Sequence, residues 1–282
     1  MIWYTSVRFD YTTVGHVTAD VLSDGSRHPG GAAFYSALQA ARLGQRALIL
    51  TQGVPGEIEE LLEPYRAELE LEIVQAAETT TLLTSGAGLE RSQRVLAWAG
   101  AIDEGVAIDS SILHLAPVAR ETPGRWRGHA DFVGLTPQGL VREWGGHSHK
   151  IRPGSPDPRR IPDSCRAIVL SEAERASSAA LMAAAAAAGT IVAVTAGASA
   201  TTILLGDDRE LTVDVPPLGC PGEDLGAGDV FAAAFFIALS EGRAAAQAAD
   251  FANAAAAVRM GGSGAQAIGD RSAIEARLRA VA

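Results

Sequence analysis

The sequence predicts an α/β protein with a doubly wound, mainly parallel sheet, helices on both faces of the sheet and a small β lid. Strand and helix patterns alternate over the first 70 residues and again after residue 110, which is typical of a parallel sheet. The stretch 79–99 breaks that alternation. At 282 residues, 48% of them apolar and 20% charged, the chain can bury a sizeable core, and we expect a single domain over 1–282.

The first third of the chain reads as two strand–helix pairs. A strand is expected over 11–17 and a loop over 23–29, followed by a helix that opens at Gly30-Gly31 and closes at Gly44. A second strand over 46–51 leads through a turn into a Glu-rich helix over 57–69. The chain therefore begins β-α-β-α.

The lid is predicted from two segments without a crossover helix. Strands over 79–84 and 93–97 are joined by the short linker 86–88, so we expect an antiparallel hairpin. The segment 21–27 contains an Asp24-Gly25 turn signal and is assigned to the same small sheet. The lid strands thus come from about 20–29 and 79–99.

The remaining elements restore the α/β alternation. Strands are expected over 111–115, 132–135, 167–170 and 190–195, and helices over 177–188, 229–241 and 250–260. We find no internal repeat and no boundary between two large domains.

Charge and composition exclude several classes of function. A net charge of −10 and a pI near 5.1 argue against nucleic-acid binding, and no apolar run is long enough to span a membrane. The start of the chain lacks a signal-peptide pattern, and Cys165 and Cys220 cannot form a disulfide framework, so we expect a cytoplasmic protein. Lys150 is the single lysine and lies in no P-loop or protein-kinase motif. Any bound phosphate must therefore be neutralised by backbone amides, arginine or metal.

The segment 222–231, GEDLGAGDVF, carries the strongest chemical signal. Its Gly-Ala-Gly turn lets a ligand approach the backbone where a helix begins, and free N–H groups at a helix start bind anions. Asp229 is placed at the first helical position, where a plain helix cap is the simpler interpretation. The all-apolar helix that follows predicts a buried helix end, and a buried anion site beside a carboxylate suits phosphoryl transfer.

This segment resembles the C-terminal signature of PfkB, or ribokinase-like, carbohydrate kinases, commonly D-T-x-G-A-G-D-x-F. The resemblance implies a ribokinase-like fold, with Asp229 as the base and the amides of Gly226, Ala227 and Gly228 as the anion hole. The sequence departs from the signature at its first Asp, where Glu223 stands, and at the Thr, where Asp224 stands.

The segment 30–44 resembles the N-terminal signature G-G-x-x-x-N-x-A…R-L-G of the same family. By this resemblance Gly30, Gly31 and the residue at 35 contact the acceptor, although Tyr35 replaces the usual Asn. Because the family's Asn usually helps to bind the sugar, Tyr35 argues against an ordinary ribose-type acceptor. A Tyr at this position resembles the inositol-kinase-like branch of the family. Without the resemblance, the segment is a loop followed by a small-residue helix packed on a sheet. Asp20 matches the family's G-x-x-x-x-D, whose Asp binds acceptor hydroxyls, while a turn aspartate is the simpler alternative.

Weaker matches follow in the family's order along the chain. Glu174 falls in a segment similar to the N-x-x-E motif that organises magnesium through water, and a first-turn helix charge is the alternative. Glu223 is a second candidate near the metal. We expect Arg142 to lie near the acceptor. The simpler alternative is an exposed arginine on a helix or turn. Four further residues are expected by resemblance to contact ATP: Thr195, Gly197, Asn253 and Gly262.

Taken together, the sequence predicts an ATP- and Mg²⁺-dependent kinase that phosphorylates a hydroxyl of a small polyol, sugar or related alcohol. The alternative is a catalytically degenerate protein of the same fold that binds a nucleotide or sugar without turnover, motivated by Tyr35, Ser171, Glu223 and Asp224. A Rossmann dehydrogenase is disfavoured because no G-x-G-x-x-G follows the first strand. An exposed lid sheet also offers an edge for a homodimer. The sequence leaves the acceptor open among inositol, sugar, sugar acid and nucleoside.

Overall fold

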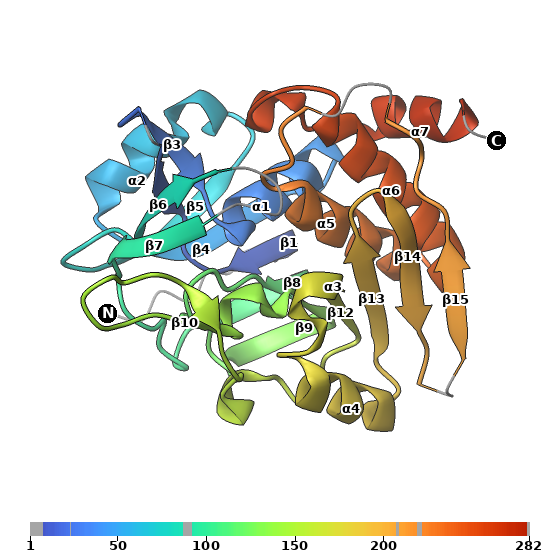
Figure 1. The fold of residues 1–282 in the computed structure, drawn as a ribbon, viewed down its shortest axis with the longest axis horizontal. Helices are drawn as coiled ribbons and strands as arrows, with labels where there is room; N and C mark the ends of the chain where they lie inside the picture. The colour runs from blue at the N-terminus through green and yellow to red at the C-terminus, as the bar shows by residue number, and fades with distance from the viewer. Residues whose placement is uncertain (1–7, 23, 87–91, 207–208, 219–221, 281–282) are drawn as a thin grey trace.

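The computed structural model describes residues 8–22, 24–86, 92–206, 209–218 and 222–280 (Figure 1). Within these residues the chain forms a nine-stranded main sheet, a four-stranded lid sheet and a two-stranded ribbon. The main sheet contains β15 (Glu210–Val213), β14 (Ser199–Leu204), β13 (Ile191–Ala196), β12 (Ala167–Ser171), β9 (Arg127–Leu135), β8 (Ala107–Leu115), β1 (Phe9–Val14), β4 (Ala47–Gly53) and β5 (Glu70–Gln75), in that spatial order.

Seven neighbouring strands of the main sheet, from β13 to β5, run parallel. At one edge β14 pairs antiparallel with β13, and β15 pairs antiparallel with β14. The parallel strands present their carboxyl ends at one edge of the sheet, where ligands bind in open α/β folds. The mainly parallel α/β architecture with a separate small β sheet that the sequence predicts is therefore confirmed.

Helices cover the two faces of the main sheet unequally. On one face α1, α5 and α6 pack together over a core that contains five fully buried phenylalanines, whereas α4 packs against β13 on the other face. The α-helices are α1 (Ala32–Arg42), α2 (Pro55–Leu62), α3 (Glu172–Arg175), α4 (Ala179–Ala188), α5 (Ala227–Ser240), α6 (Ala245–Met260) and α7 (Arg271–Arg279). Short 3₁₀ turns are η1 (Glu63–Tyr65), η3 (Pro137–Gly139), η4 (Pro158–Arg160) and η5 (Ala265–Ala267).

The lid sheet lies beside the main sheet and has the order β3-β2-β6-β7 (Figure 1). Its strands are β2 (Thr18–Val21), β3 (Arg27–Gly30), β6 (Thr81–Ser85) and β7 (Ser92–Ala97). The pairing of β6 with β7 is antiparallel, as the sequence predicts, and part of the predicted linker 86–88 lies outside the described residues. Gly25, with φ 83°, lies in the turn between β2 and β3. The ribbon β10 (Arg142–Glu143) and β11 (Arg152–Pro153) lies next to β7.

Two sequence-based expectations about the main sheet are wrong. The helix expected over 57–69 ends at Leu62 and continues only as the turn η1, which contains Pro64, a residue without an N–H for a helical hydrogen bond. The next residues form β5, an edge strand whose charged and apolar residues alternate. Strands β14 and β15 were also not predicted, because β14 is polar and β15 is only four residues long.

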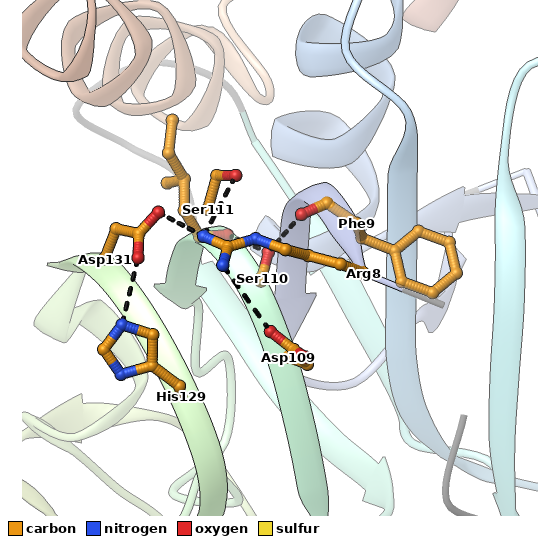
Figure 2. Close-up of polar contacts among 8 residues, drawn as sticks. Arg8, Phe9, Asp109, Ser110, Ser111, His129 and Asp131 are labelled. Atoms are coloured by element: carbon orange, nitrogen blue, oxygen red, sulfur yellow. Dashed lines mark hydrogen bonds and ion pairs between the residues drawn. The ribbon is translucent and has the colours of Figure 1, made fainter. Parts of the chain in front are cut away.

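A charged cluster occupies the sheet away from the carboxyl ends of the strands (Figure 2). Arg8 precedes β1 and forms an ion pair with Asp131 on β9, and it lies 4.0 Å from Asp109 on β8. His129 contacts the other carboxylate oxygen of Asp131 at 3.0 Å. These groups are about half exposed, so the cluster ties three strands together at the surface and contributes little stability. No helix in the described part of the chain has the length and apolar character needed to cross a membrane.

Candidate active site

The amino end of α5 is the centre of the candidate site. The residues of α5 from Val230 to Ala238 are all buried, as the sequence predicts for an inward-facing helix end. Gly226 is the N-cap, with φ 79°, and α5 begins at Ala227. Asp229 is therefore the third helical residue and not the first, which corrects the expectation from the sequence. A Cβ atom added at Gly226 would lie 2.4 Å from the ring of Tyr35, so both conformation and space require glycine here.

The carboxyl group of Asp229 lies in an environment that disfavours its charged form. Burial among protein atoms raises the pKa of Asp229 to about 7, because the charged form is poorly solvated there. Arg142 opposes this shift, and the nearby carboxylates of Glu174 and Asp20 reinforce it. The backbone carbonyl of Asp229 accepts a hydrogen bond from the Ser36 hydroxyl at 3.1 Å, which ties α5 to α1. A carboxyl group that titrates near neutral pH suits proton transfer.

The backbone amides at the start of α5 are the candidates for an anion hole. The N–H of Ala227 donates to the carbonyl of Asp224 at 3.1 Å, so it is already used within the turn. The N–H groups of Gly226, Gly228 and Asp229 donate to no backbone carbonyl among the described residues. Of the predicted anion-hole amides, those of Gly226 and Gly228 are therefore available for an anion, and the amide of Asp229 is a further candidate.

Asp229 faces a cavity of about 690 Å³ between the main sheet and the lid. Residues from the lid, α1, the ribbon, α3 and α5 line it, so segments far apart in the sequence meet here. Eight of the predicted catalytic, binding and metal residues line this cavity: Asp20, Gly31, Tyr35, Arg142, Glu174, Gly226, Gly228 and Asp229.

Asp20 reaches this cavity from β2 of the lid. Its side chain is buried and accepts a hydrogen bond from the Thr18 hydroxyl at 2.7 Å. Gly30 does not line the cavity, but a Cβ there would lie 2.3 Å from the Asp20 carboxylate, so glycine gives this carboxylate its space. At Gly31, with φ 93°, a Cβ would lie 2.2 Å from the carbonyl oxygen of His16. The two glycines thus bring the start of α1 close to the lid.

Tyr35 occupies the position of the expected Asn and is almost fully buried. Its ring packs against Gly226 and lies 5.1 Å from the ring of Phe34. Burial raises the pKa of Tyr35, and the carboxylate of Asp20 acts in the same direction, so the phenol stays neutral. Tyr35 therefore supports the Gly226 turn and gives this wall of the cavity a neutral surface.

Arg142 lies on β10 at the cavity wall and is partly buried there. The alternative interpretation, an exposed arginine, does not describe this position. Its guanidinium donates to the Val118 carbonyl at 3.0 Å and to the side-chain oxygen of Gln93 at 3.1 Å. Burial lowers the pKa of Arg142, while the carboxylates of Glu174 and Asp229 raise it. Among the described residues, none of the carboxylates lies within 4.0 Å of this guanidinium.

A second, smaller cavity of about 270 Å³ adjoins the first at Gly228, which lines both. Thr195 and Gly197 line this slot, as does Asn253, and its walls are mostly apolar. Gly262 does not line the slot; its carbonyl accepts from Arg259 at 3.3 Å beyond the end of α6. The other residues of the wall are Ala198, Thr201, Val215, Pro216, Pro217, Leu218, Ala227, Phe231, Ala256, Ala257 and Met260.

Asn253 holds the wall of this slot together. Its side-chain oxygen accepts from the Thr201 hydroxyl at 2.9 Å, and its side-chain nitrogen donates to the Asp214 carbonyl at 3.1 Å. These bonds connect α6 to β14 and to the segment after β15. Because most of its polar capacity is used within the protein, Asn253 shapes the slot more than it offers hydrogen bonds to a ligand.

The two candidate metal residues differ in position. Glu174 lines the larger cavity, and one of its carboxylate oxygens accepts from the Ser171 N–H at 2.8 Å in a capping box at the start of α3. Glu223 does not line the cavity; its carboxylate accepts from the Gly264 N–H at 2.9 Å and lies 3.4 Å from Arg259. Among the described residues, no cluster of three or more acidic, His or Cys side chains could hold a metal by itself. Because Mg²⁺ keeps several waters and uses few protein carboxylates, the single carboxylate of Glu174 is compatible with a water-mediated Mg²⁺ site.

Sequence reasoning missed two buried charged residues that build the site. Arg259 on α6 is fully buried and donates to the carbonyls of Leu225 (2.7 Å) and Glu223 (3.3 Å), which fixes the turn before α5. Glu121 is also fully buried, and its carboxylate accepts from the backbone N–H groups of His16, Val118 and Ala119. An arginine within the apolar α6 sequence was a usable signal for Arg259, whereas Glu121 stands in a loop without a recognisable pattern.

Comparisons with known proteins show what this chain is similar to. Residues 167–271 match the model of the pfkB family carbohydrate kinases, and this segment includes the turn before α5. No curated protein matches the sequence. A pyrophosphate-dependent kinase in the ribokinase family superimposes with a TM-score of 0.74 at 20% identity, over 94% of this chain and 99% of that one. Ribokinase from Arabidopsis thaliana complexed with ribose and ATP gives 0.73 at 18%, over 97% and 99%. The resemblance to the PfkB family that the motifs predict is therefore confirmed.

Proposed function

We propose that this protein is a Mg²⁺- and ATP-dependent kinase that phosphorylates a hydroxyl group of a small polyol or sugar-like alcohol. The observation that carries the proposal is the position of Gly228, which lines both cavities, with Asp229 next to it in the larger one. A donor in the apolar slot and an acceptor in the larger cavity would meet at these two residues. The match to carbohydrate kinases over residues 167–271 supports the same reaction.

In the proposed reaction, Asp229 removes the proton of the acceptor hydroxyl. The freed oxygen attacks the γ-phosphorus of ATP, the bond from that phosphorus to the bridging oxygen breaks, and ADP leaves with the electron pair. The proton stays on the Asp229 carboxyl until it is released to solvent. A pKa of about 7 leaves a large ionised fraction at neutral pH and makes the carboxylate a stronger base than an ordinary aspartate.

The negative charge of the phosphoryl group needs stabilisation from outside Asp229. The amides of Gly228 and Asp229 point from the start of α5, and the macrodipole of that helix favours an anion there. Mg²⁺ on the donor phosphates would neutralise further charge, and Glu174, with one carboxylate oxygen not used by Ser171, would hold it through water.

The apolar slot supports a nucleotide as the donor. Its walls are built mainly from Pro, Ala, Leu, Val, Met and Phe side chains, which suit the faces of an adenine ring more than a bare polyphosphate. One structurally similar protein is a pyrophosphate-dependent kinase, so pyrophosphate is the donor to compare with ATP. An ATP-specific enzyme should need the slot, whereas a pyrophosphate-dependent one should not.

The alternative is a binding protein on this fold without turnover. Tyr35 motivates it, because a bulky ring stands where the family has Asn, and so does the use of Glu223 to hold Arg259 and Gly264. The retained Asp229 carboxyl favours a kinase, since a pure binder has no use for a base beside the anion site.

The proposal is tested by incubating the purified protein and Mg²⁺ with ATP or pyrophosphate and a panel of acceptors, and following the products by ³¹P NMR. The panel contains inositols, pentoses, hexoses, sugar acids and nucleosides. A phosphomonoester formed from ATP supports the kinase. Saturable acceptor binding without any product identifies a binder, and product from pyrophosphate alone contradicts the nucleotide donor.

A further inference from the structure

One wall of the larger cavity carries three basic side chains, Arg142, Lys150 and Arg152. All three come from the ribbon formed by β10, β11 and the residues between them. Lys150 is the only lysine in a chain with a net charge of −10. In a protein with a net negative charge, three basic side chains at one cavity wall form a local positive patch, which attracts an anionic ligand.

None of these three side chains is neutralised within the described part of the protein. No ion pair within 4.0 Å joins any of them to a carboxylate there. By contrast, Arg42 pairs with Glu68 and Arg46 pairs with Glu70 on the protein surface. The basic wall thus retains positive charge for a ligand.

Hydrogen bonds hold the backbone of the ribbon and the Arg142 side chain in position, while Lys150 and Arg152 are exposed residues. Arg142 is fixed by the Val118 carbonyl and by Gln93, as described above. The segment that carries Lys150 pairs with β7 of the lid: the Ile151 N–H donates to the Gln93 carbonyl at 2.9 Å, and the Val95 N–H donates to the His149 carbonyl at 3.0 Å. The backbone that carries these side chains is therefore already ordered before a ligand binds.

The same cavity is acidic on its other walls, where Asp20, Glu174 and Asp229 stand. An anionic group of a ligand would be repelled by those carboxylates and attracted to the ribbon. The donor slot meets the cavity on α5, and no basic residue is among those that line the slot. The basic wall is thus separate from the donor slot and belongs to the acceptor's part of the cavity.

We propose that the acceptor is an anionic alcohol, whose carboxylate or phosphate group binds to Arg142, Lys150 and Arg152 while its reacting hydroxyl points to Asp229. This inference rests on the proposed kinase function and narrows its substrate class to hydroxy acids or phosphorylated polyols. Carboxylate and phosphate share the chemistry that a basic wall recognises, since both accept charge-assisted hydrogen bonds from arginine and lysine.

The test measures binding first and turnover second, with Lys150→Gln and Arg152→Gln. The probes are one neutral hexitol, the six-carbon aldonate and the hexitol monophosphate, titrated calorimetrically into the protein at low salt. We expect an anionic probe to bind at least about tenfold more tightly than the neutral one, and each variant to lose about tenfold of that affinity, as for a charge-assisted hydrogen bond. Arg66→Gln, which removes an exposed charge that does not line the cavity, should bind as the wild type does.

The outcomes separate this inference from the proposed function. Tighter binding of the aldonate identifies a carboxylate ligand, and tighter binding of the monophosphate identifies a phosphate ligand. Anion binding that depends on Lys150 and Arg152 without phosphoryl transfer contradicts the kinase and supports the anion site. Equal affinity for neutral and anionic probes, unchanged in both variants, overturns the anion site even if the neutral alcohol is phosphorylated. A raised KM for ATP with unchanged acceptor affinity also overturns it, because the cations then serve the donor.

Discussion

The ring of Tyr35 packs against Gly226, the N-cap residue of α5 with φ 79°, and a Cβ at Gly226 would lie 2.4 Å from that ring. The start of α1 and the start of α5 are thereby held together at the point where both cavities meet. Two glycines at the start of α5 have different roles: Gly226 is needed for the fold, and Gly228 leaves space for a ligand. Single substitutions can separate these roles.

Gly226→Ala should destabilise the fold, and Gly228→Ala should not. Alanine at 226 must adopt φ 79° and displace Tyr35, and we expect a loss of about 2–4 kcal/mol in the free energy of unfolding. A Cβ at Gly228 has no protein atom within 4 Å, so it would extend into ligand space. Gly228→Ala should therefore unfold as the wild type does in urea, while its kcat/KM falls at least about tenfold. Equal stability of the two variants would contradict this view of the turn.

The pKa of Asp229 predicts opposite effects of pH on activity and stability. Because the ionised form is the base, kcat/KM should rise with pH through about 7. The folded-state pKa lies above the usual value of 3.8, so the proton is bound more tightly in the folded protein. The resulting stability is fully present below pH 4 and is lost as the pH rises through 7.

Asp229→Asn checks the stability part of this prediction, since the amide stays neutral at every pH. We expect the variant to be more stable than the wild type at pH 8, by about 1–3 kcal/mol, and the difference to disappear below pH 4. Urea denaturation at the two pH values measures it. A wild type that is equally stable to the variant at pH 8 would show that Asp229 has an ordinary pKa.

Arg259→Met should destabilise the turn before α5, although Arg259 lines neither of the two cavities. The substitution removes the donor from the carbonyls of Leu225, Glu223 and Gly262, and we expect a loss of about 2–4 kcal/mol in the free energy of unfolding. Glu223→Gln is the matched control: the Glu223 side chain is 40% exposed, so its pairing with Arg259 should be worth less than about 1 kcal/mol. A neutral Arg259→Met would refute the structural role of this residue.

How much of the site could be predicted depended on whether its residues form a local pattern. The segment 222–231 contains glycines followed by a long apolar run, and this pattern predicts the buried start of a helix. The structure has that arrangement. Asp20 and Gly31 were found through family motifs, and they line the same cavity as Asp229.

The features that were missed or misplaced depend on contacts between distant segments. Glu121 stabilises two loops through backbone N–H groups about 100 residues apart, which no spacing in the sequence reveals. Which amides are available at the start of α5 depends on the Ala227–Asp224 hydrogen bond, a detail of turn geometry. Glu223 keeps a carboxylate at a metal-motif position, yet Arg259 and Gly264 hold it outside the cavity. In the fold, β5 was missed because it follows a proline-ended helix and is exposed on one side.

Ala256→Leu tests the assignment of the slot to the donor's base. Ala256 is a partly exposed residue of α6 that lines the slot, and a larger side chain there should reduce the space for an adenine ring. We expect the KM for ATP to rise at least about tenfold, as for a lost hydrophobic subsite, with the acceptor KM and the melting temperature unchanged. If pyrophosphate serves as a donor in the wild type, its KM should not change in this variant. An unchanged KM for ATP would place the base elsewhere.

The central claim is that Asp229 removes the acceptor proton, and single-turnover phosphoryl transfer by Asp229→Asn tests it most directly. The rate should fall about 10²- to 10⁴-fold while ATP binds at least as tightly as to the wild type, because the fold and the Gly228 amide are kept. Asp250→Asn, the same change on an exposed part of α6, should transfer at the wild-type rate. Transfer by Asp229→Asn within about threefold of the wild-type rate, far short of the loss expected for a removed base, would contradict the account.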